Sequence, residues 1–521
     1  MKNKQFGDFQ TPPELIRKIL KILGPIGRGW TRVLEPTCGL GNFIKEIIET
    51  PDPPAEIVGI ELNEKYCEQA RNILNDGKTN IKIIQGDIFD DSIIKNIKWK
   101  NNGELLLIGN PPWVTNSEIG SRGGNNLPIK NNNNNVKGLD ALTGKSNFDI
   151  AESILIKLLN IFASAGATFC FLCKSSVARN VIHYCHDTKI PMNDIEIRHI
   201  DAKKWFDASV DACLFLFEIH RNAKITGSDY ISKIYEDVES LSPQKLSGYV
   251  NSLFVTDIEK YRRLSYIDGH CHLNWRQGIK HDAASIMELV KSDNGYVNKI
   301  GERVSVEHEY IYPLLKSSDV NNYLKNTEPD KYVIITQKSI NEDTICLKKK
   351  APKLWDYLSS HAEAFQKRKS SIYKSNKPFS IFGVGDYTFS KNKVMVSGLY
   401  KSPKFISVGT FNSKPVVCDD TCYLLPCSNP VESATLGCLL NSNEILDFIK
   451  CISSSDSKRP ITKAILMRID LKEAFIRSNR DELALNVKEL LKTTIPRLKP
   501  PSSSDISDIL SVKNELPLFA P

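Results

Sequence analysis

Apolar and polar positions alternate along the first 220 residues with two different periods. Short apolar runs have the length and composition of buried strands, and they lie at 32–36, 56–61, 81–84 and 104–108. Between these runs, apolar residues recur every three or four positions, which predicts helices at 12–24, 43–49 and 64–74. Strands that alternate with helices predict a doubly wound, largely parallel sheet of the α/β class.

The same alternation continues to residue 222. It predicts a helix at 148–164, a strand at 167–173, a helix at 175–187 and two strands at 194–200 and 210–219. Because only a short connection joins the last two strands, we expect them to form an antiparallel hairpin at the edge of the sheet. The sequence therefore predicts a first domain over residues 1–222.

Beyond residue 222 the regular alternation fades. Short β-like runs occur at 332–336, 394–397, 405–408 and 422–425, and helical patterns occur at 352–366, 431–451 and 470–492. We interpret 223–500 as an α+β region of one or two modules, and the proline- and serine-rich 501–521 as a flexible tail. Within the first domain, the glycine- and asparagine-rich residues 116–146 predict a long loop.

The length and composition agree with a protein of more than one domain. A chain of 521 residues exceeds what one core usually organises. No apolar run approaches the ~20 residues that span a bilayer, so we expect no membrane segment. The 13 cysteines are scattered through mostly apolar segments, which favours a reducing cytoplasm over a disulfide framework.

Two cysteine-containing motifs contain residue types that can bind a metal ion. Cys170 and Cys173 lie three positions apart on an expected strand, so they should face opposite sides of it. The motif His270-Cys271-His272 has no second ligand cluster at zinc spacing nearby. We therefore expect no metal site.

The net charge of +8 is modest, but basic residues are concentrated in one stretch. From 348 to 404, lysine and arginine outnumber acidic residues 13 to three, and ten aromatic residues lie between Trp355 and Phe405. Basic side chains interleaved with aromatic ones suit a phosphate backbone and stacked bases. A solvated basic face beside an ordinary core would have the same composition.

A tight glycine turn follows the first predicted strand, in the sequence VLEPTCGLGNF from Val33 to Phe43. Glycine lets the backbone approach a ligand closely, here at the carboxyl end of a strand, where open α/β sheets bind ligands. The candidate ligand-contacting residues in this turn are Glu35, Thr37, Cys38, Gly39 and Gly41.

Two acidic residues end the next strands. Glu61 follows Gly41 by 20 residues, and a carboxylate in this position can hold two ribose hydroxyls. Asp87 ends the third strand, where it can accept a hydrogen bond from an adenine amino group, with Ile88 or Phe89 against the ring. Together with the glycine turn, these residues predict a pocket for a nucleoside-containing cofactor.

The tetrapeptide Asn110-Pro111-Pro112-Trp113 ends the fourth strand. An aromatic amino group is a poor nucleophile because its lone pair is delocalised into the ring. The amide oxygen of Asn110 and the backbone carbonyl of Pro111 can accept its N–H bonds, which orients the lone pair and stabilises the developing charge. Consecutive prolines fix that carbonyl, and Trp113 offers a flat face for a planar target.

These motifs follow the order Thr-Pro-Pro at 11–13, glycine turn, Asn-Pro-Pro-Trp and a large C-terminal region. In that order the chain resembles the gamma group of DNA amino-methyltransferases, the TaqI-like enzymes of type II restriction–modification systems. The resemblance covers most of 8–220 and, more loosely, about 270–425. It implies a class I methyltransferase domain, S-adenosyl-L-methionine as cofactor, and a target-recognition region at 223–500.

The resemblance also implies roles for further residues. Thr11 would contact the cofactor, as would Phe148 in a motif that closes over it. Trp113 and Phe206 would stack on the extruded target base. Segments 368–373, 382–387 and 396–401 look like parts of a recognition domain, and the expected DNA contacts are Arg368, Lys369, Lys393 and Lys401.

The activity implied is methylation of adenine N6 at specific sites in duplex DNA, with the target base extruded from the stack. The expected partners are double-stranded DNA and a separate restriction endonuclease, and we expect a cytoplasmic, nucleoid-associated monomer. Alternatives are methylation of cytosine N4, of an amino group in RNA or protein, or a degenerate DNA-binding defence protein. Two features depart from the family pattern: Trp113 replaces the frequent Tyr or Phe, and the loop 116–146 is long.

Overall fold

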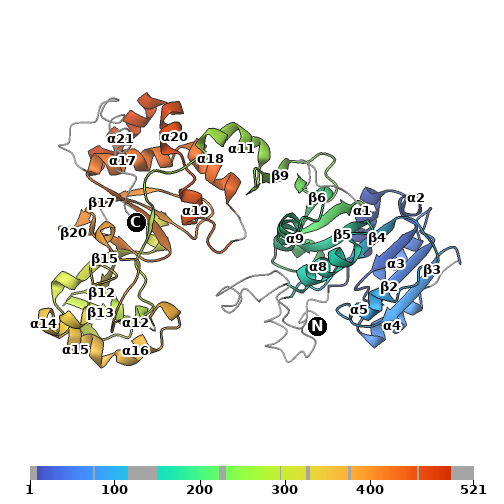
Figure 1. Ribbon diagram of the computed structural model, residues 1–521, viewed down its shortest axis with the longest axis horizontal. Coiled ribbons are helices and arrows are strands. Elements are labelled where there is room, and N and C mark those ends of the chain that lie inside the picture. The colour runs from blue at the N-terminus through green and yellow to red at the C-terminus, as the bar shows by residue number, and fades with distance from the viewer. Residues whose placement is uncertain are drawn as a thin grey trace. The chain divides into compact units, whose positions relative to one another are not determined.

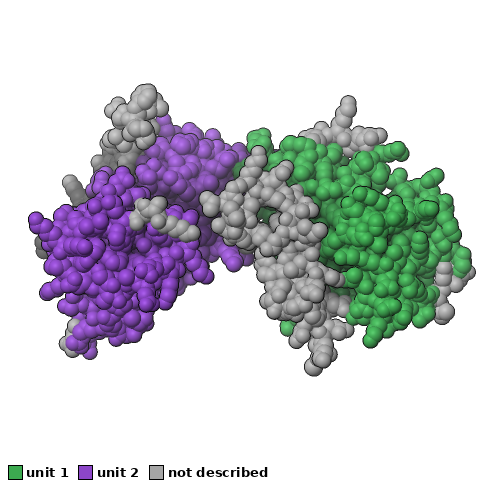
Figure 2. Space-filling view, turned by 60° about the horizontal axis from the view of Figure 1, so that its bottom comes forward, with its two compact units in different colours: residues 1–258 green, residues 259–521 purple. Residues whose placement is uncertain are grey.

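The computed structural model divides into two compact units, residues 1–258 and residues 259–521 (Figure 2). The residues that it describes are 9–73, 77–114, 149–221, 230–293, 295–323, 329–373, 377–453 and 457–494. The loop expected at 116–146 and the tail expected at 501–521 lie outside these described residues.

The first unit is built around a sheet that has ten strands in the described ranges. In spatial order they are β10 (Leu253–Val255), β9 (Lys245–Val250), β8 (Ile231–Tyr235), β6 (Asn193–Ile200), β7 (Ala212–Ile219), β5 (Ala167–Lys174), β4 (Leu105–Gly109), β1 (Arg32–Glu35), β2 (Glu56–Glu61) and β3 (Asn80–Gln85). Strands β3, β2, β1, β4 and β5 pair in parallel, and β7 runs antiparallel to β5 and β6.

Helices cover both faces of this sheet, so the predicted doubly wound α/β fold is confirmed (Figure 1). They are α1 (Pro13–Leu23), α2 (Ile26–Gly29), α3 (Asn42–Ile48), α4 (Glu64–Arg71), α5 (Asp91–Lys95), α8 (Ile150–Phe162), α9 (Ser175–Thr188) and α10 (Ala202–Phe206). Helices α1, α3 and α10 pack in one core, and α8 and α9 in the other. Cys170 lies in the first core and Cys173 in the second, which confirms that they face opposite sides.

The hairpin of β6 and β7 is antiparallel as predicted, but it does not lie at the sheet edge. Strand β8 pairs in parallel with β6, and β9 and β10 continue the sheet outward in antiparallel fashion. The predicted end of the first domain at residue 222 is therefore wrong, because the compact unit continues to residue 258.

Aromatic packing explains why these added strands belong to the first unit. The Tyr249 ring on β9 stacks on His186 of α9 with a centroid distance of 3.6 Å. The Phe254 ring on β10 meets the edge of His183, also on α9, at 4.6 Å. Strands β9 and β10 bury these rings against α9 by extending the sheet beside it, a long-range contact that local periodicity does not reveal.

The second unit is an α+β assembly, as expected. Its larger described sheet has the order β14-β13-β12-β16-β15-β21, a second sheet has the order β11-β22-β17-β18, and β19 pairs with β20. The strands are β11 (Arg276–Gln277), β12 (Glu288–Ser292), β13 (Gly295–Asn298), β14 (Arg303–Val304), β15 (Ile311–Leu315), β16 (Lys331–Ile334), β17 (Asn392–Ser397), β18 (Ile406–Val408), β19 (Thr410–Phe411), β20 (Lys414–Pro415), β21 (Val417–Cys418) and β22 (Cys422–Cys427).

Helix α11 (Ile258–Leu264) begins at the boundary between the units. The other α-helices of the second unit are α12 (Ala284–Met287), α13 (Ser317–Asn321), α14 (Leu347–Lys350), α15 (Pro352–Ser360), α16 (Ala362–Gln366), α17 (Pro430–Leu440), α18 (Asn443–Ile452), α19 (Lys463–Leu466), α20 (Leu471–Arg477) and α21 (Arg480–Thr494). Each long helix predicted here is divided into two; for example, Ser442 caps a new helix start by accepting from the Ile445 N–H. No helix within the described ranges is long and apolar enough to span a membrane.

Candidate active site

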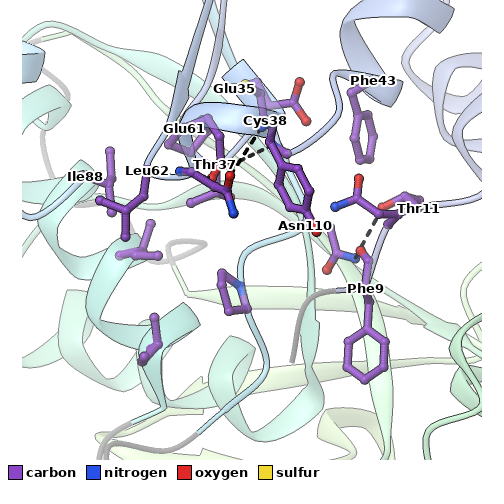
Figure 3. A pocket seen from close by; sticks show the side chains of 18 of the residues that line it. Phe9, Thr11, Glu35, Thr37, Cys38, Phe43, Glu61, Leu62, Ile88 and Asn110 are labelled. Atoms are coloured by element: carbon purple, nitrogen blue, oxygen red, sulfur yellow. Dashed lines mark hydrogen bonds between the residues drawn. The ribbon is translucent and has the colours of Figure 1, made fainter. Parts of the chain in front are cut away.

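A cavity of about 550 Å³ opens at the carboxyl ends of β1 to β4 (Figure 3). Parallel strands end at the same edge of a sheet, so polar residues far apart in sequence meet there. The predicted residues that line the cavity are Thr11, Glu35, Thr37, Cys38, Gly39, Glu61, Asp87, Ile88, Asn110 and Pro112.

The glycine turn between β1 and α3 shapes one wall. Gly39 has a φ of +52° and Gly41 a φ of +80°, both in the left-handed region that favours glycine. A Cβ on Gly41 would lie 2.5 Å from the Cδ1 of Ile73. Gly41 therefore supports the turn by close packing and does not itself line the cavity.

Two backbone N–H groups hold the Glu61 carboxylate in place. Gly39 N donates to Oε2 at 2.9 Å and Asn63 N donates to Oε1 at 2.7 Å. The carboxylate braces the glycine turn, and each of its oxygens has a second lone pair available for a ligand hydroxyl. Beside it, burial raises the pKa of the Cys38 thiol far above its usual range, so this side chain stays a neutral lining group.

Asp87 lies in the turn between β3 and α5. Its Oδ1 accepts a hydrogen bond from Phe89 N at 2.9 Å, which fixes the carboxylate at the cavity wall. Ile88 is buried and lines the same wall. A carboxylate and an apolar side chain next to each other suit a flat, polar-edged ring.

The amide of Asn110 has a defined orientation. Its Nδ2 donates to the Phe9 carbonyl oxygen at 3.1 Å and to Thr11 Oγ1 at 3.2 Å. Because a carbonyl oxygen can only accept, the nitrogen must face Phe9, and Oδ1 must point the other way. The chain therefore holds Oδ1 as an acceptor at the edge of the cavity.

Three buried oxygen atoms in the cavity wall have no hydrogen-bond partner among the described residues. They are Glu35 Oε2, Thr37 Oγ1 and Asn110 Oδ1. A buried polar atom without a partner costs roughly 1–3 kcal/mol. Three of them in one cavity indicate that a ligand with several hydrogen-bond donors completes the site.

Glu35 is buried, with 2% of its surface exposed. Burial raises the pKa of its carboxyl well above the ordinary value, the negative charge of Glu61 raises it further, and a backbone hydrogen bond from Ile44 opposes this only in part. The surroundings of Glu35 within the protein thus favour the neutral acid, and a cationic ligand would favour the carboxylate.

Replacement of Glu35 by Gln should stabilise the ligand-free protein increasingly as the pH rises. A carboxyl whose pKa is raised by folding stabilises the native state fully below its unfolded pKa, and this contribution is lost as the pH rises through the folded pKa. Glu35→Gln should therefore unfold at about the wild-type temperature at pH 4, and at a higher temperature at pH 8. Parallel melts at both pH values test this. Glu68→Gln, at an exposed position on α4, is the control, and an equal shift at both pH values would contradict the argument.

Trp113 and Phe206 come together but do not line the cavity. Their ring centroids are 5.1 Å apart, edge to face, and Trp113 Nε1 donates to the Leu172 carbonyl at 3.3 Å. Phe9 is the third member of this cluster, 5.5 Å from Trp113 and 5.7 Å from Phe206. Phe9 was not predicted as a site residue, although it lies only two residues before Thr11.

Gln10 and Asn42 also line the cavity and were not predicted, although one adjoins Thr11 and the other ends the glycine turn. Gln10 Oε1 accepts from Leu40 N at 3.3 Å, and Asn42 Nδ2 donates to the Thr11 carbonyl at 3.0 Å. These bonds hold the Thr-Pro-Pro segment against the glycine turn. Pro111 is buried outside the cavity lining, and Phe148 lies outside the described residues.

The four predicted DNA contacts fall into two classes. Lys369 and Lys401 are exposed, as a phosphate contact requires. Lys393 is 1% exposed, and its amine donates to the carbonyl oxygens of Thr388 and Val416 at 2.7 and 2.5 Å. The prediction for Lys393 is therefore wrong: its amine ties two segments together inside the core, and burial lowers its pKa to about 8.

Arg368 also serves the fold of the second unit. Its guanidinium donates to the carbonyl oxygens of Ser380 at 2.7 Å and Phe365 at 3.1 Å. It also lies 3.7 Å from the centre of the Tyr373 ring. These bonds use Nε and Nη1 and leave Arg368 half-buried, so its contact with phosphate stays a prediction.

Comparison with known proteins finds one relative that matches nearly the whole chain. The type II methyltransferase M.NspV of Nostoc sp. (strain ATCC 29411 / PCC 7524) is 40% identical over 474 residues, which are 90% of this chain and 96% of the relative. The type II methyltransferase M.CvrRI of Paramecium bursaria Chlorella virus XZ-6E is 33% identical over 110 residues, 21% of this chain and 25% of that protein. No family model matches the chain.

Among solved structures, the type IIL restriction–modification enzyme MmeI in complex with DNA is similar over 97% of this chain and 77% of its own. The TM-score is 0.44 and the identity is 11%. A protein from Listeria monocytogenes that has been assigned to the class I S-adenosylmethionine-dependent methyltransferases is also similar. The match covers 44% of this chain and 67% of that protein, with a TM-score of 0.30 and 11% identity.

Proposed function

Because the chain belongs to the type II methyltransferases, we propose that it transfers the methyl group of S-adenosylmethionine to N6 of adenine at a specific site in duplex DNA. The observation that carries this proposal is Asn110 Oδ1, a buried acceptor without a partner among the described residues. Its amide nitrogen is held by Phe9 and Thr11, so the oxygen is the group left to bind a donor.

Several residues of the cavity would hold S-adenosylmethionine. The ribose hydroxyls would donate to the Glu61 carboxylate, whose position is set by Gly39 and Asn63. The adenine amino group would donate to Asp87, and the cationic ammonium of the methionine part would pair with Glu35. When bound, the cofactor supplies an electrophilic methyl group on a sulfonium centre.

The chain's own residues then act on the target amino group. Asn110 Oδ1 and the Pro111 carbonyl accept its two N–H bonds, so the nitrogen lone pair is directed away from them. As positive charge develops on that nitrogen, these two acceptors stabilise it. The new N–C bond forms as the S–C bond of the sulfonium breaks, which leaves S-adenosylhomocysteine as the second product. The methylated nitrogen then releases one proton to water.

The ring cluster provides the other half of the target site. The extruded base would stack on Trp113, with the edge of Phe206 beside it. In the structure the Phe9 ring contacts both of these rings, so the base would enter only as the three rings separate. The second unit would contact the DNA backbone through exposed lysines such as Lys369 and Lys401. A restriction endonuclease with the same target would be a separate chain.

Transfer of a labelled methyl group to duplex DNA tests the proposed function. The purified protein should label duplex DNA that contains its site, and enzymatic digestion of that DNA should release N6-methyladenine as the labelled nucleoside. N4-methylcytosine would keep the enzyme class and overturn the choice of base, since the same two acceptors suit that amino group. Label in RNA or protein and none in DNA would overturn the choice of substrate, and a protein that binds no cofactor would overturn the activity.

A further inference from the structure

Three segments of the second unit cross one another at backbone distance. They are 276–282, 382–387 and 418–422. Gly278 donates to the Cys422 carbonyl at 3.0 Å, and a Cβ at this position would lie 2.1 Å from the Asp419 carbonyl oxygen. Gly383 has a φ of +67°, and its Cβ would lie 2.3 Å from the Gly278 carbonyl oxygen. No side chain fits between these segments, so they form one rigid platform, which we call the glycine crossing.

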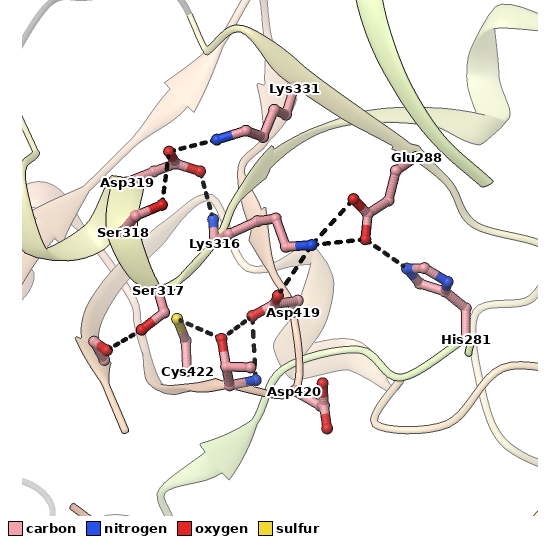
Figure 4. A network of polar contacts seen from close by, with 12 residues as sticks. His281, Glu288, Lys316, Ser317, Ser318, Asp319, Lys331, Asp419, Asp420 and Cys422 are labelled. Carbon is pink, nitrogen blue, oxygen red and sulfur yellow. Dashed lines mark hydrogen bonds and ion pairs between the residues drawn. The ribbon is translucent and has the colours of Figure 1, made fainter. Parts of the chain in front are cut away.

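A network of buried polar and charged side chains connects two segments of the glycine crossing (Figure 4). Glu288 is 4% exposed, and its two carboxylate oxygens accept from Lys316 at 2.9 and 3.1 Å. His281 Nε2 lies 3.6 Å from Glu288 Oε1, and Lys316 Nζ lies 3.8 Å from Asp419 Oδ2. Burial by itself raises the pKa of Glu288, but hydrogen bonds from Lys299 and Lys316 hold it below the usual value. The network therefore links segment 276–282, through His281, to segment 418–422, through Asp419. Burial lowers the pKa of His281 and raises that of Asp419, so the charge of the network lies on Glu288 and Lys316.

The outer face of the crossing presents Arg276. The preceding Trp275 is fully buried and anchors the short strand β11, which pairs with β22. Arg276 itself is exposed, and its guanidinium lies over the Tyr387 ring at 5.2 Å from the ring centre. Tyr387 belongs to segment 382–387 of the glycine crossing. The backbone of the crossing therefore positions both Arg276 and the ring beneath its guanidinium.

Arg276 differs from the neighbouring arginines in its unused donors. Arg459 is bonded to Asp420, and Arg468 makes two hydrogen bonds to Asp268. Within the ranges that the structure describes, the Arg276 guanidinium makes no hydrogen bond or ion pair, although its backbone is paired in β11 and its ring support is Tyr387. A guanidinium that is held in place and has spare donors is suited to bidentate recognition.

We infer that Arg276 is a specificity-determining residue that reads a guanine of the DNA target through its O6 and N7 acceptors in the major groove. The inference rests on the proposed function. The fixed backbone of β11 and the Tyr387 ring hold the guanidinium in place, which bidentate reading of a base edge requires. A phosphate contact is the alternative outcome of the test below.

Methylation maps of randomised duplex DNA test the inference. Wild-type protein should methylate a motif that contains at least one discriminated G·C pair. Arg276→Ala should lose discrimination at that one pair by on the order of 10- to 100-fold and keep its preferences elsewhere. Arg276→Lys keeps the charge and should recover only part of the discrimination. Arg303→Ala, which removes an exposed strand arginine far along the chain from the crossing, is the matched control and should keep the whole motif.

The outcomes separate the alternatives. An Arg276→Ala variant with unchanged preferences at every position would overturn the assignment, as would a wild-type motif without a discriminated G·C pair. A uniform loss across all sequences, with the salt dependence of binding reduced by about one charge, would make Arg276 a phosphate contact. A folded wild-type protein that methylates no duplex DNA would overturn the proposed function itself, and this inference with it.

Discussion

Asn110→Ala should lower the rate of methyl transfer by roughly 10³-fold, which corresponds to about 4 kcal/mol of transition-state stabilisation. The variant loses the one acceptor in the cavity whose orientation is fixed by the Phe9 carbonyl and Thr11 Oγ1. It keeps Glu61, Asp87 and the glycine turn, so its affinity for S-adenosylmethionine should stay within about twofold of wild type. Single-turnover transfer and cofactor titration calorimetry measure these two quantities separately.

The matched control for this experiment is Asn96→Ala. Asn96 is an exposed asparagine at the end of α5 in the same unit and lies outside the cavity lining. It should transfer methyl groups at the wild-type rate. An Asn110→Ala variant with full activity would remove the proposed chemistry. Loss of cofactor binding together with activity would instead mean that Asn110 supports the shape of the cavity.

Glu61→Ala should weaken S-adenosylmethionine binding by about 100-fold, or roughly 3 kcal/mol. Two hydrogen bonds from ribose hydroxyls to a carboxylate contribute about this much, since bonds to charged groups are the stronger ones. The loss should also loosen the glycine turn, because Gly39 N would lose its acceptor. Calorimetric titration measures the affinity, and saturating cofactor should restore most of the transfer rate.

A nearby glutamate provides the control. Glu64 lies in the first turn of α4, is exposed, and does not line the cavity. Glu64→Ala should bind the cofactor as the wild type does. Wild-type affinity in Glu61→Ala would show that the ribose is bound elsewhere, whereas a low rate that saturating cofactor does not restore would place Glu61 in the transfer step.

Local sequence patterns could predict the features that depend only on neighbouring residues, such as strand periodicity and the position of strand ends. Strands β1 to β5 are short, apolar and parallel, so their ends had to meet at one edge. Glu35, Glu61, Asp87 and Asn110 lie at those ends and therefore converge on one cavity. The facing of Cys170 and Cys173 followed from the two-residue period of a strand.

The division of the long helices is a local error, but the errors with the largest effect on the fold concern contacts between distant parts of the chain. Strands β8 to β10 join the first sheet because Tyr249 and Phe254 pack on α9, and nothing within 231–255 reveals this. Lys393 stands in a basic stretch, yet its amine is buried on two backbone carbonyls. A count of charges cannot distinguish a solvated lysine from one that replaces water with carbonyl oxygens.

The continuation of the sheet as far as β10 also determines where the protein can be recombined with its relatives. A chimaera joined near residue 222 would take β8 to β10 from the other parent. Strand β8 would then have to pair with β6, and Tyr249 to pack on α9, across a junction of two different sequences. A mismatch there would open the edge of β6, and open edges promote aggregation. A joint in the short segment between Val255, where β10 ends, and Ile258, where α11 begins, would exchange the second units while each parent keeps a complete sheet.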